Sequence, residues 1–301
     1  MKSLLISIFT LPILFPTFAQ AKLQVATTTT DLAAIVKQVG ADQVDVFAIA
    51  KGTQDPHQVE AKPSFMVKLR STDIIFAQGL ELESAWIIPL IQGARNPKLL
   101  AKDGLYELAG ELDPIEVSKG DVSRAEGDVH PGGNPHFQLD PIRLGKAALL
   151  IAKRLSELDP SHKDFYENNA KHFQQIMIDK TKEWLARIQK SGVKEIVTYH
   201  KQFSYFCARF DLRCDVQLEP KPGIPPTTSH LLDVIKQMKA RNIHLVFIEN
   251  LYDDSVAPKL KQEVPGTVVN RIAVSVDGDP GLSTNEKLIE NLVKAIEQGA
   301  H

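Results

Sequence analysis

The 301-residue sequence has little net charge and no long uninterrupted hydrophobic run. Its 35 Lys and Arg residues nearly balance its 37 Asp and Glu residues, and no basic patch occurs, which argues against a nucleic-acid partner. The apolar stretch near the N-terminus, residues 4–18, is interrupted by Pro12 and Pro16 and is too short for a membrane-spanning helix. These absences point to a soluble globular protein.

The same apolar stretch is typical of a cleaved export signal. It follows Lys2, and Ala19-Gln20-Ala21 has the small-x-small pattern of a cleavage site. We therefore expect residues 1–21 to be a signal peptide and the mature chain to begin at Lys22. No cysteine follows the cleavage site, so the sequence predicts a free protein of the bacterial periplasm without a lipid anchor.

Cysteine is scarce: the chain has only Cys207 and Cys214, and a CxxC metal or redox motif is absent. In an oxidising compartment, such a closely spaced pair favours a disulfide. Closing so short a loop would stabilise the fold by roughly 2–3 kcal/mol. Two reduced, buried thiols are the alternative.

The sequence does have the composition of a globular protein and the alternation of strands and helices that is typical of an α/β fold. Hydrophobic residues make up 43% and charged residues 24%, which is ample for a core, and the length suggests two domains. Strand-like and helical segments alternate in both halves, which predicts parallel sheets with right-handed crossovers. The expected strands are residues 23–26, 44–49, 73–77 and 98–100 in the first half and 195–199, 215–218, 245–248 and 267–269 in the second.

Two long helical patterns, residues 141–158 and 161–189, separate the halves. The second contains no Gly or Pro and would span on the order of 40 Å, which suits a rod that braces two domains. The predicted fold class is therefore α/β, with two lobes that each hold a parallel sheet flanked by helices, joined by one long helix. We expect the first lobe at residues 22–160, the linking helix at 161–190 and the second lobe at 191–301.

Several side chains that bind metals follow the predicted strands. His57 comes after the second strand, His200 after the fifth, and His136 lies in a turn rich in Gly and Pro. Ligands of open parallel sheets bind beyond the carboxyl ends of the strands. These three imidazoles are therefore expected to meet in a cleft between the lobes, where Glu249 and Asp277 could supply a carboxylate.

Three imidazoles and a carboxylate are a suitable ligand set for Zn2+, which takes four tetrahedral nitrogen and oxygen ligands. One anionic ligand would partly neutralise the buried dication. For Glu249, a role as an acceptor that orients an imidazole is favoured over direct ligation. The acidic segment 110–134 is expected to be an exposed, mobile loop, with His130 as a candidate for weak metal capture.

Several motifs together resemble the metal-binding proteins of bacterial zinc and manganese ABC importers. They follow that family's order over nearly all of the mature chain. The matching stretches are Asp55-Pro56-His57, Phe76-Ala77-Gln78-Gly79-Leu80-Glu81-Leu82-Glu83, Asn134-Pro135-His136-Phe137-Gln138-Leu139-Asp140-Pro141, Asp164-Phe165-Tyr166, Thr198-Tyr199-His200 and the tail around Asp277.

The resemblance implies two lobes linked by a long helix with the metal buried between them. It implies His57, His136 and His200 as ligands and an acid of the last loop as the fourth. Asp277 is the expected acid, and Asp279, Glu249 or water are its alternatives.

The resemblance also implies a function: a non-enzymatic, monomeric carrier that delivers Zn2+ to an inner-membrane ABC permease with its cytoplasmic ATPase. Family members that look manganese-selective tend to carry Glu where this chain has His200, and nitrogen ligands suit zinc better than manganese. Manganese or mixed transport is the alternative. A zinc hydrolase is disfavoured because no general base or nucleophile motif accompanies the histidines, and an adhesin would leave the cleft histidines unexplained.

Overall fold

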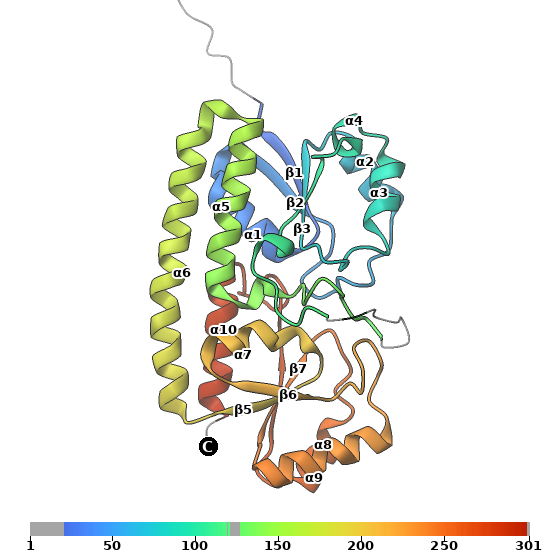
Figure 1. Ribbon diagram of the computed structural model, residues 1–301, viewed down its shortest axis with the longest axis vertical. Helices are drawn as coiled ribbons and strands as arrows, with labels where there is room; N and C mark the ends of the chain where they lie inside the picture. The colour runs from blue at the N-terminus through green and yellow to red at the C-terminus, as the bar shows by residue number, and fades with distance from the viewer. Residues whose placement is uncertain (1–20, 119, 121–126, 300–301) are drawn as a thin grey trace, which may run out of the picture.

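The computed structural model describes residues 21–118, 120 and 127–299, and shows two α/β lobes stacked along the long axis of the molecule (Figure 1). Each lobe contains one four-stranded sheet, and every pairing of neighbouring strands is parallel. The fold class predicted from the alternating pattern is confirmed. Apart from its last residue, the predicted signal peptide lies outside the described residues.

The first sheet has the strand order β2-β1-β3-β4. Its four residues in β3 are all buried, as expected for a strand with helices over both faces. The elements of this lobe are β1 (Leu23–Thr27), α1 (Thr30–Gly40), β2 (Val44–Ala48), α2 (Pro63–Leu69), β3 (Ile74–Ala77), α3 (Ile87–Ala94), α4 (Pro97–Leu100) and β4 (Leu105–Glu107).

The prediction of a strand at residues 98–100 is wrong. These residues form the short helix α4, because the Asn96 side chain caps the turn by accepting from the Lys98 N–H and Pro97 stands at the first helical position. The fourth strand, β4, follows a few residues later and pairs with β3.

The second sheet repeats the arrangement in the order β6-β5-β7-β8. In each lobe, the strand that comes first in sequence thus lies between that lobe's second and third strands, although no sequence repeat relates the halves. The elements are β5 (Glu195–Thr198), α7 (Ser204–Phe210), β6 (Arg213–Gln217), α8 (Thr228–Arg241), β7 (Leu245–Glu249), α9 (Ala257–Glu263), β8 (Val268–Ile272) and α10 (Asn285–Gln298).

Two antiparallel helices, α5 (Pro141–Leu158) and α6 (Lys163–Ser191), join the lobes, and α6 runs alongside both of them at the left of Figure 1. Phe173 near the middle of α6 packs in the core of the first lobe, whereas Trp184 packs in the core of the second. Polar contacts strengthen the second attachment, since Trp184 and Arg187 both donate to Glu290 on α10. The long helix predicted at residues 161–190 is therefore observed, and it contacts both cores. Among the described residues, none of the helices has the length and apolar character needed to cross a membrane.

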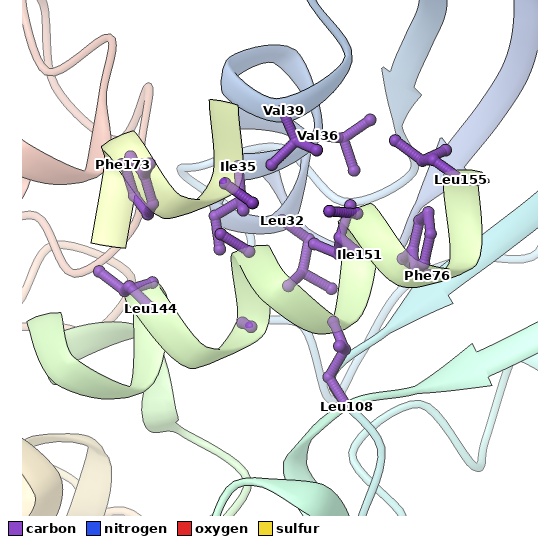
Figure 2. Close-up of a cluster of buried hydrophobic side chains, with 14 of the residues drawn as sticks. Leu32, Ile35, Val36, Val39, Phe76, Leu108, Leu144, Ile151, Leu155 and Phe173 are labelled. Carbon is purple, nitrogen blue, oxygen red and sulfur yellow. The ribbon is translucent and has the colours of Figure 1, made fainter. Parts of the chain in front are cut away.

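The core of the first lobe lies between the sheet and these helices (Figure 2). Leu32, Ile35 and Val39 repeat at helical spacing, so one stripe of α1 faces the core. That stripe packs against Ile151 of α5 and Phe76 of β3. Helix α1 is thereby held between the sheet and helix α5.

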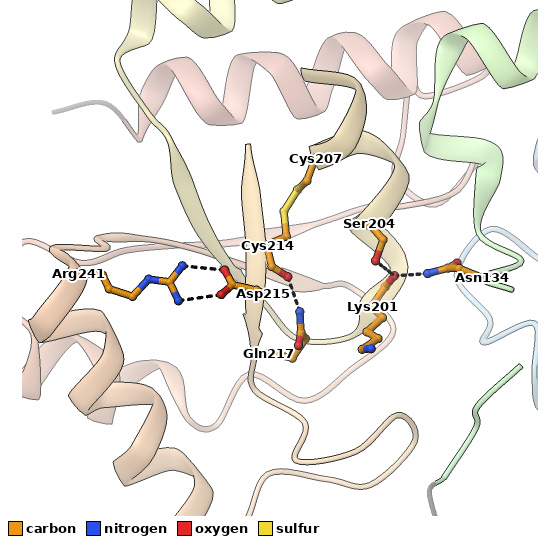
Figure 3. Close-up of a disulfide and its surroundings, with 8 residues drawn as sticks. All are labelled: Asn134, Lys201, Ser204, Cys207, Cys214, Asp215, Gln217 and Arg241. Carbon is orange, nitrogen blue, oxygen red and sulfur yellow. Dashed lines mark hydrogen bonds and ion pairs between the residues drawn. A yellow bond between two sulfur atoms is a disulfide. The ribbon is translucent and has the colours of Figure 1, made fainter. Parts of the chain in front are cut away.

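Cys207 in the middle of α7 and Cys214 in β6 form a disulfide, the pairing expected from their spacing (Figure 3). The Leu212 N–H also donates to the Cys207 carbonyl, at 2.9 Å. The disulfide therefore ties the helix that follows His200 to the neighbouring strand.

The start of α1 makes a second contact between the lobes. Asp31 is fully buried, and one of its carboxylate oxygens accepts the Val276 N–H at 2.9 Å. Thr30 donates to the Val276 carbonyl at 2.6 Å, and Asn285 donates to the Asp31 carbonyl. Burial, with a smaller contribution from Asp277, raises the pKa of Asp31 to about 7.

This raised pKa predicts a pH-dependent stability. Asp31 holds its proton in the folded state up to about pH 7, whereas the unfolded chain releases it near pH 4. The folded state binds more protons in that window, so this group's contribution to stability falls as the pH rises from 4 to 7. In metal-free protein, Asp31→Asn should reduce the loss of unfolding free energy between pH 5 and pH 7 by on the order of 1.4 kcal/mol per pH unit. Urea unfolding at both pH values measures this, and identical pH dependence of wild type and variant would contradict it.

Candidate metal centre

Three histidines from distant parts of the chain meet between the lobes. His57 lies in the loop after β2, His136 in the loop before α5, and His200 two residues after β5. Each offers one ring nitrogen, and these nitrogens all lie within 4.8 Å of one another. The structure thus brings together the three imidazoles selected from the sequence, two from the first lobe and one from the second.

His57 is oriented by the carboxylate two residues before it. Asp55 Oδ1 lies 2.8 Å from His57 Nδ1 and also accepts the His57 backbone N–H at 2.9 Å. Burial alone would raise the pKa of Asp55, but these bonds from His57 lower it below its ordinary value. Trp86 donates to the Pro56 carbonyl and anchors the loop. His57 Nδ1 therefore carries the proton, which leaves the Nε2 lone pair free for a metal.

His200 is oriented in the same way by Glu219, whose Oε2 lies 2.7 Å from His200 Nδ1 and also accepts the Gly223 N–H. The sequence suggested Glu249 as the orienting acid, but Glu249 accepts the backbone N–H of His200 at 3.1 Å. Burial raises the pKa of Glu249 to about 8, so it is mostly protonated at neutral pH. Sequence reasoning missed Glu219, although it follows the carboxyl end of β6 as the other site residues follow their strands.

His136 is buried, and neither of its ring nitrogens has a hydrogen-bond partner in the part of the chain that the structure describes. Its burial, together with the nearby imidazoles of His57 and His200, holds its pKa well below the ordinary value. An unpartnered buried polar group is costly and needs an explanation. A neutral imidazole held ready for a metal ion provides one.

Asn134 connects the His136 loop to the second lobe. Its Oδ1 accepts the His136 N–H at 2.9 Å, and its Nδ2 donates to the carbonyl of Lys201, the residue after His200 (Figure 3). Tyr205 on α7 donates to the Asn134 carbonyl at 2.6 Å. One amide side chain thus links the backbone of the His136 loop in the first lobe to the backbone beside His200 in the second.

Asp140, at the end of the same loop, forms a buried ion-pair network. Its carboxylate caps α5 by accepting the Ile142 N–H, and it accepts two bonds from Arg209 on α7 at 2.8 and 2.9 Å. Arg143 donates to it from α5. The Gly- and Pro-rich segment 132–141 is therefore a joint between the lobes as well as the support of His136.

A fourth imidazole lies beside the group. His130 Nε2 is 3.2 Å from His57 Nε2. Burial, with a smaller contribution from His57, lowers the pKa of His130 to about 4. A cavity of about 490 Å³ is lined by His130, His136 and His200. The predicted exposed loop, residues 110–134, is described at both ends, and its second end is partly buried at this cavity.

The structure does not bring Asp277 to the three imidazoles. Asp277 is exposed and lines a separate cavity of about 200 Å³ with Thr30 and Lys37. It has a left-handed backbone, φ 58°, in a turn closed by its N–H bond to the Leu282 carbonyl. Asp279 is exposed as well. Within the described ranges, the group whose ligand atoms lie within 4.8 Å of one another contains no carboxylate.

Two α/β lobes with buried imidazoles converging between them define a protein that binds a metal ion. The chain belongs to the family described as "Zinc-uptake complex component A periplasmic", whose family model matches residues 25–299. The fold is similar to the crystal structure of ZnuA, with a TM-score of 0.79, 23% identity and coverage of 93% of this chain and 100% of the other. It is also similar to the laminin-binding protein Lmb of Streptococcus agalactiae, titled a bifunctional protein with adhesin and metal transporting activity, with a TM-score of 0.75, 24% identity and coverage of 93% and 100%.

Curated relatives agree with this assignment. The manganese ABC transporter substrate-binding lipoprotein PsaA of Streptococcus anginosus is 27% identical over 286 residues, which cover 92% of this chain and 89% of the relative. The metal ABC transporter substrate-binding lipoprotein SsaB of Streptococcus sanguinis is 29% identical over 242 residues, which cover 78% and 74%. These names include lipoproteins, in contrast to the expectation that this chain has no lipid anchor, and residues 1–20 lie outside the described part.

The chain is therefore the substrate-binding component of a metal ABC transporter and not an enzyme. It acts outside the cytoplasm, and its partners are a membrane permease and the associated ATPase.

The orientation of His200 by Glu219 can be tested directly. Glu219→Ala removes the acceptor of His200 Nδ1, so affinity for divalent metal should fall about 10–100-fold. A competition titration against a chromophoric chelator measures the change, with thermal unfolding of metal-free protein as the test of folding. Glu263→Ala on α9, where Glu263 pairs with two surface lysines, is the matched control and should bind as wild type does. Equal affinity of Glu219→Ala and the control would contradict this role.

Proposed function

We propose that this protein captures Zn2+ with His57, His136 and His200 and delivers it to its permease. The observation that carries the proposal is the meeting of three imidazoles, of which His136 is buried with both ring nitrogens unpartnered. Imidazole nitrogen suits zinc, whereas manganese favours sites rich in carboxylate and carbonyl oxygen. Because the group of three holds no carboxylate, zinc is favoured over manganese or mixed transport.

Two carboxylates behind the ligands support the binding of a dication. Asp55 and Glu219 hold the Nδ1 atoms of His57 and His200 at 2.8 and 2.7 Å. Each can compensate one positive charge without touching the ion, so the site does not require an anionic ligand to bury Zn2+. Their bonds also make the ligating nitrogens more basic.

The proposed location is the periplasm, after cleavage of residues 1–21, as a free monomer. The apolar segment and the Ala19-Gln20-Ala21 pattern support an export signal. The two cysteines of the chain are both in the disulfide, far from the cleavage site, which leaves no thiol there to carry a lipid.

Replacing His200 tests both the ligand set and the metal. His200→Ala removes the ligand supplied by the second lobe and should lose most of the zinc affinity, while the protein stays folded because the two cores do not depend on the ion. Calorimetric titration with Zn2+ and with Mn2+ measures both affinities. His200→Glu should shift the preference toward Mn2+, since it introduces oxygen ligands.

His172→Ala is the matched control, because His172 is exposed on α6. It should bind both ions as wild type does. Zinc binding by His200→Ala that equals the control would overturn the ligand assignment, and wild-type preference for Mn2+ would overturn the choice of zinc.

A further inference from the structure

The geometry points to His130 as the fourth ligand of the bound ion, which makes the site all-imidazole. This inference rests on the proposed zinc function and deepens it, because it names the group that completes the coordination shell. It also assigns the loop of residues 127–131 a role in closing the site from the side of the second lobe.

The first observation is the distance between two ring nitrogens. His57 Nε2 and His130 Nε2 are 3.2 Å apart. Two nitrogens bound to one tetrahedral zinc ion at 2.0–2.1 Å are separated by about 3.3–3.4 Å. The two rings are thus already spaced as neighbouring ligands.

The second observation concerns protons. Neutral His57 donates through Nδ1 to Asp55, so its Nε2 carries the lone pair and can only accept. The hydrogen bond between the two Nε2 atoms then places a proton on His130 Nε2. A zinc ion between the two nitrogens replaces this shared proton, and His130 then binds through Nε2 in its other tautomer.

The third observation is the attachment of the loop to the second lobe. The Asp128 N–H donates to the Pro222 carbonyl at 2.9 Å. Gly127 has φ +86°, and a Cβ on it would lie 2.1 Å from the same carbonyl oxygen, so only glycine allows this approach. Gly223, the residue after Pro222, donates its N–H to Glu219, and Glu219 holds His200. The loop carrying His130 is thus docked on the segment that orients His200.

His130 lies beside the group of three and not within it, since its ring centroid is 6.4 Å from that of His136. Binding therefore requires the His130 ring to move toward His136 as the ion enters. Among the described residues, the group of three contains no carboxylate, and Asp277 lines another cavity. Four nitrogen ligands would also disfavour Mn2+ further than three.

The test uses the full mature chain with His130→Ala and, as a matched control, His172→Ala. X-ray absorption at the zinc edge counts the imidazole ligands, and competition titration gives the affinity. We expect four imidazoles in wild type and in the control but three in His130→Ala, with zinc affinity lowered about 10–100-fold. Gly127→Ala, which keeps His130 but displaces its loop from Pro222, should show a smaller loss.

The outcomes separate this inference from the proposed function. If wild type binds zinc through three imidazoles and His130→Ala binds as tightly as the control, His130 is not a ligand while the zinc function stands. If wild type does not bind zinc, or His200→Ala binds it unchanged, the proposed function itself fails.

Discussion

The structure depends on one constraint: a divalent cation can be buried between two lobes only if its ligands are held in place and its charge is compensated. Imidazoles fixed by carboxylates behind them would meet both conditions. Asp55 and Glu219 each hold one nitrogen of His57 and His200, and in the proposed site each would bring a negative charge close to the ion without occupying a ligand position.

The same constraint explains why the joint between the lobes is so polar. Asp140 is fully buried, yet its carboxylate caps a helix of the first lobe and pairs with Arg209 of the second. Asn134 connects the backbone of His136 to that of Lys201. Because the hydrogen bonds of these groups are complete only when both lobes are correctly placed, they favour one position of His136 relative to His200. Helix α6 adds an apolar attachment to each core at a larger distance from the site.

Much of the fold could be predicted from the sequence because its segments show strong local patterns. The buried run Ile74–Ala77 and the glycine-free run that became α6 have one structural solution each. Residues 98–100 were misassigned because three apolar or long side chains carry too little periodicity, and the deciding signals were the cap at Asn96 and Pro97. The secondary structure was therefore predicted correctly where many residues of a segment follow one pattern, and wrongly where a single helix cap determines the structure.

For the site, the sequence by itself determined which imidazoles are available and at which strand ends they stand, since parallel topology places those ends at one edge. Only the tertiary structure decided which side chains face the centre. Glu219 and His130 turn toward it, whereas Asp277 lines a separate cavity. The physical reason is that a side chain's direction in a loop depends on local turns and on contacts with the opposite lobe. No pattern along one segment contains those contacts.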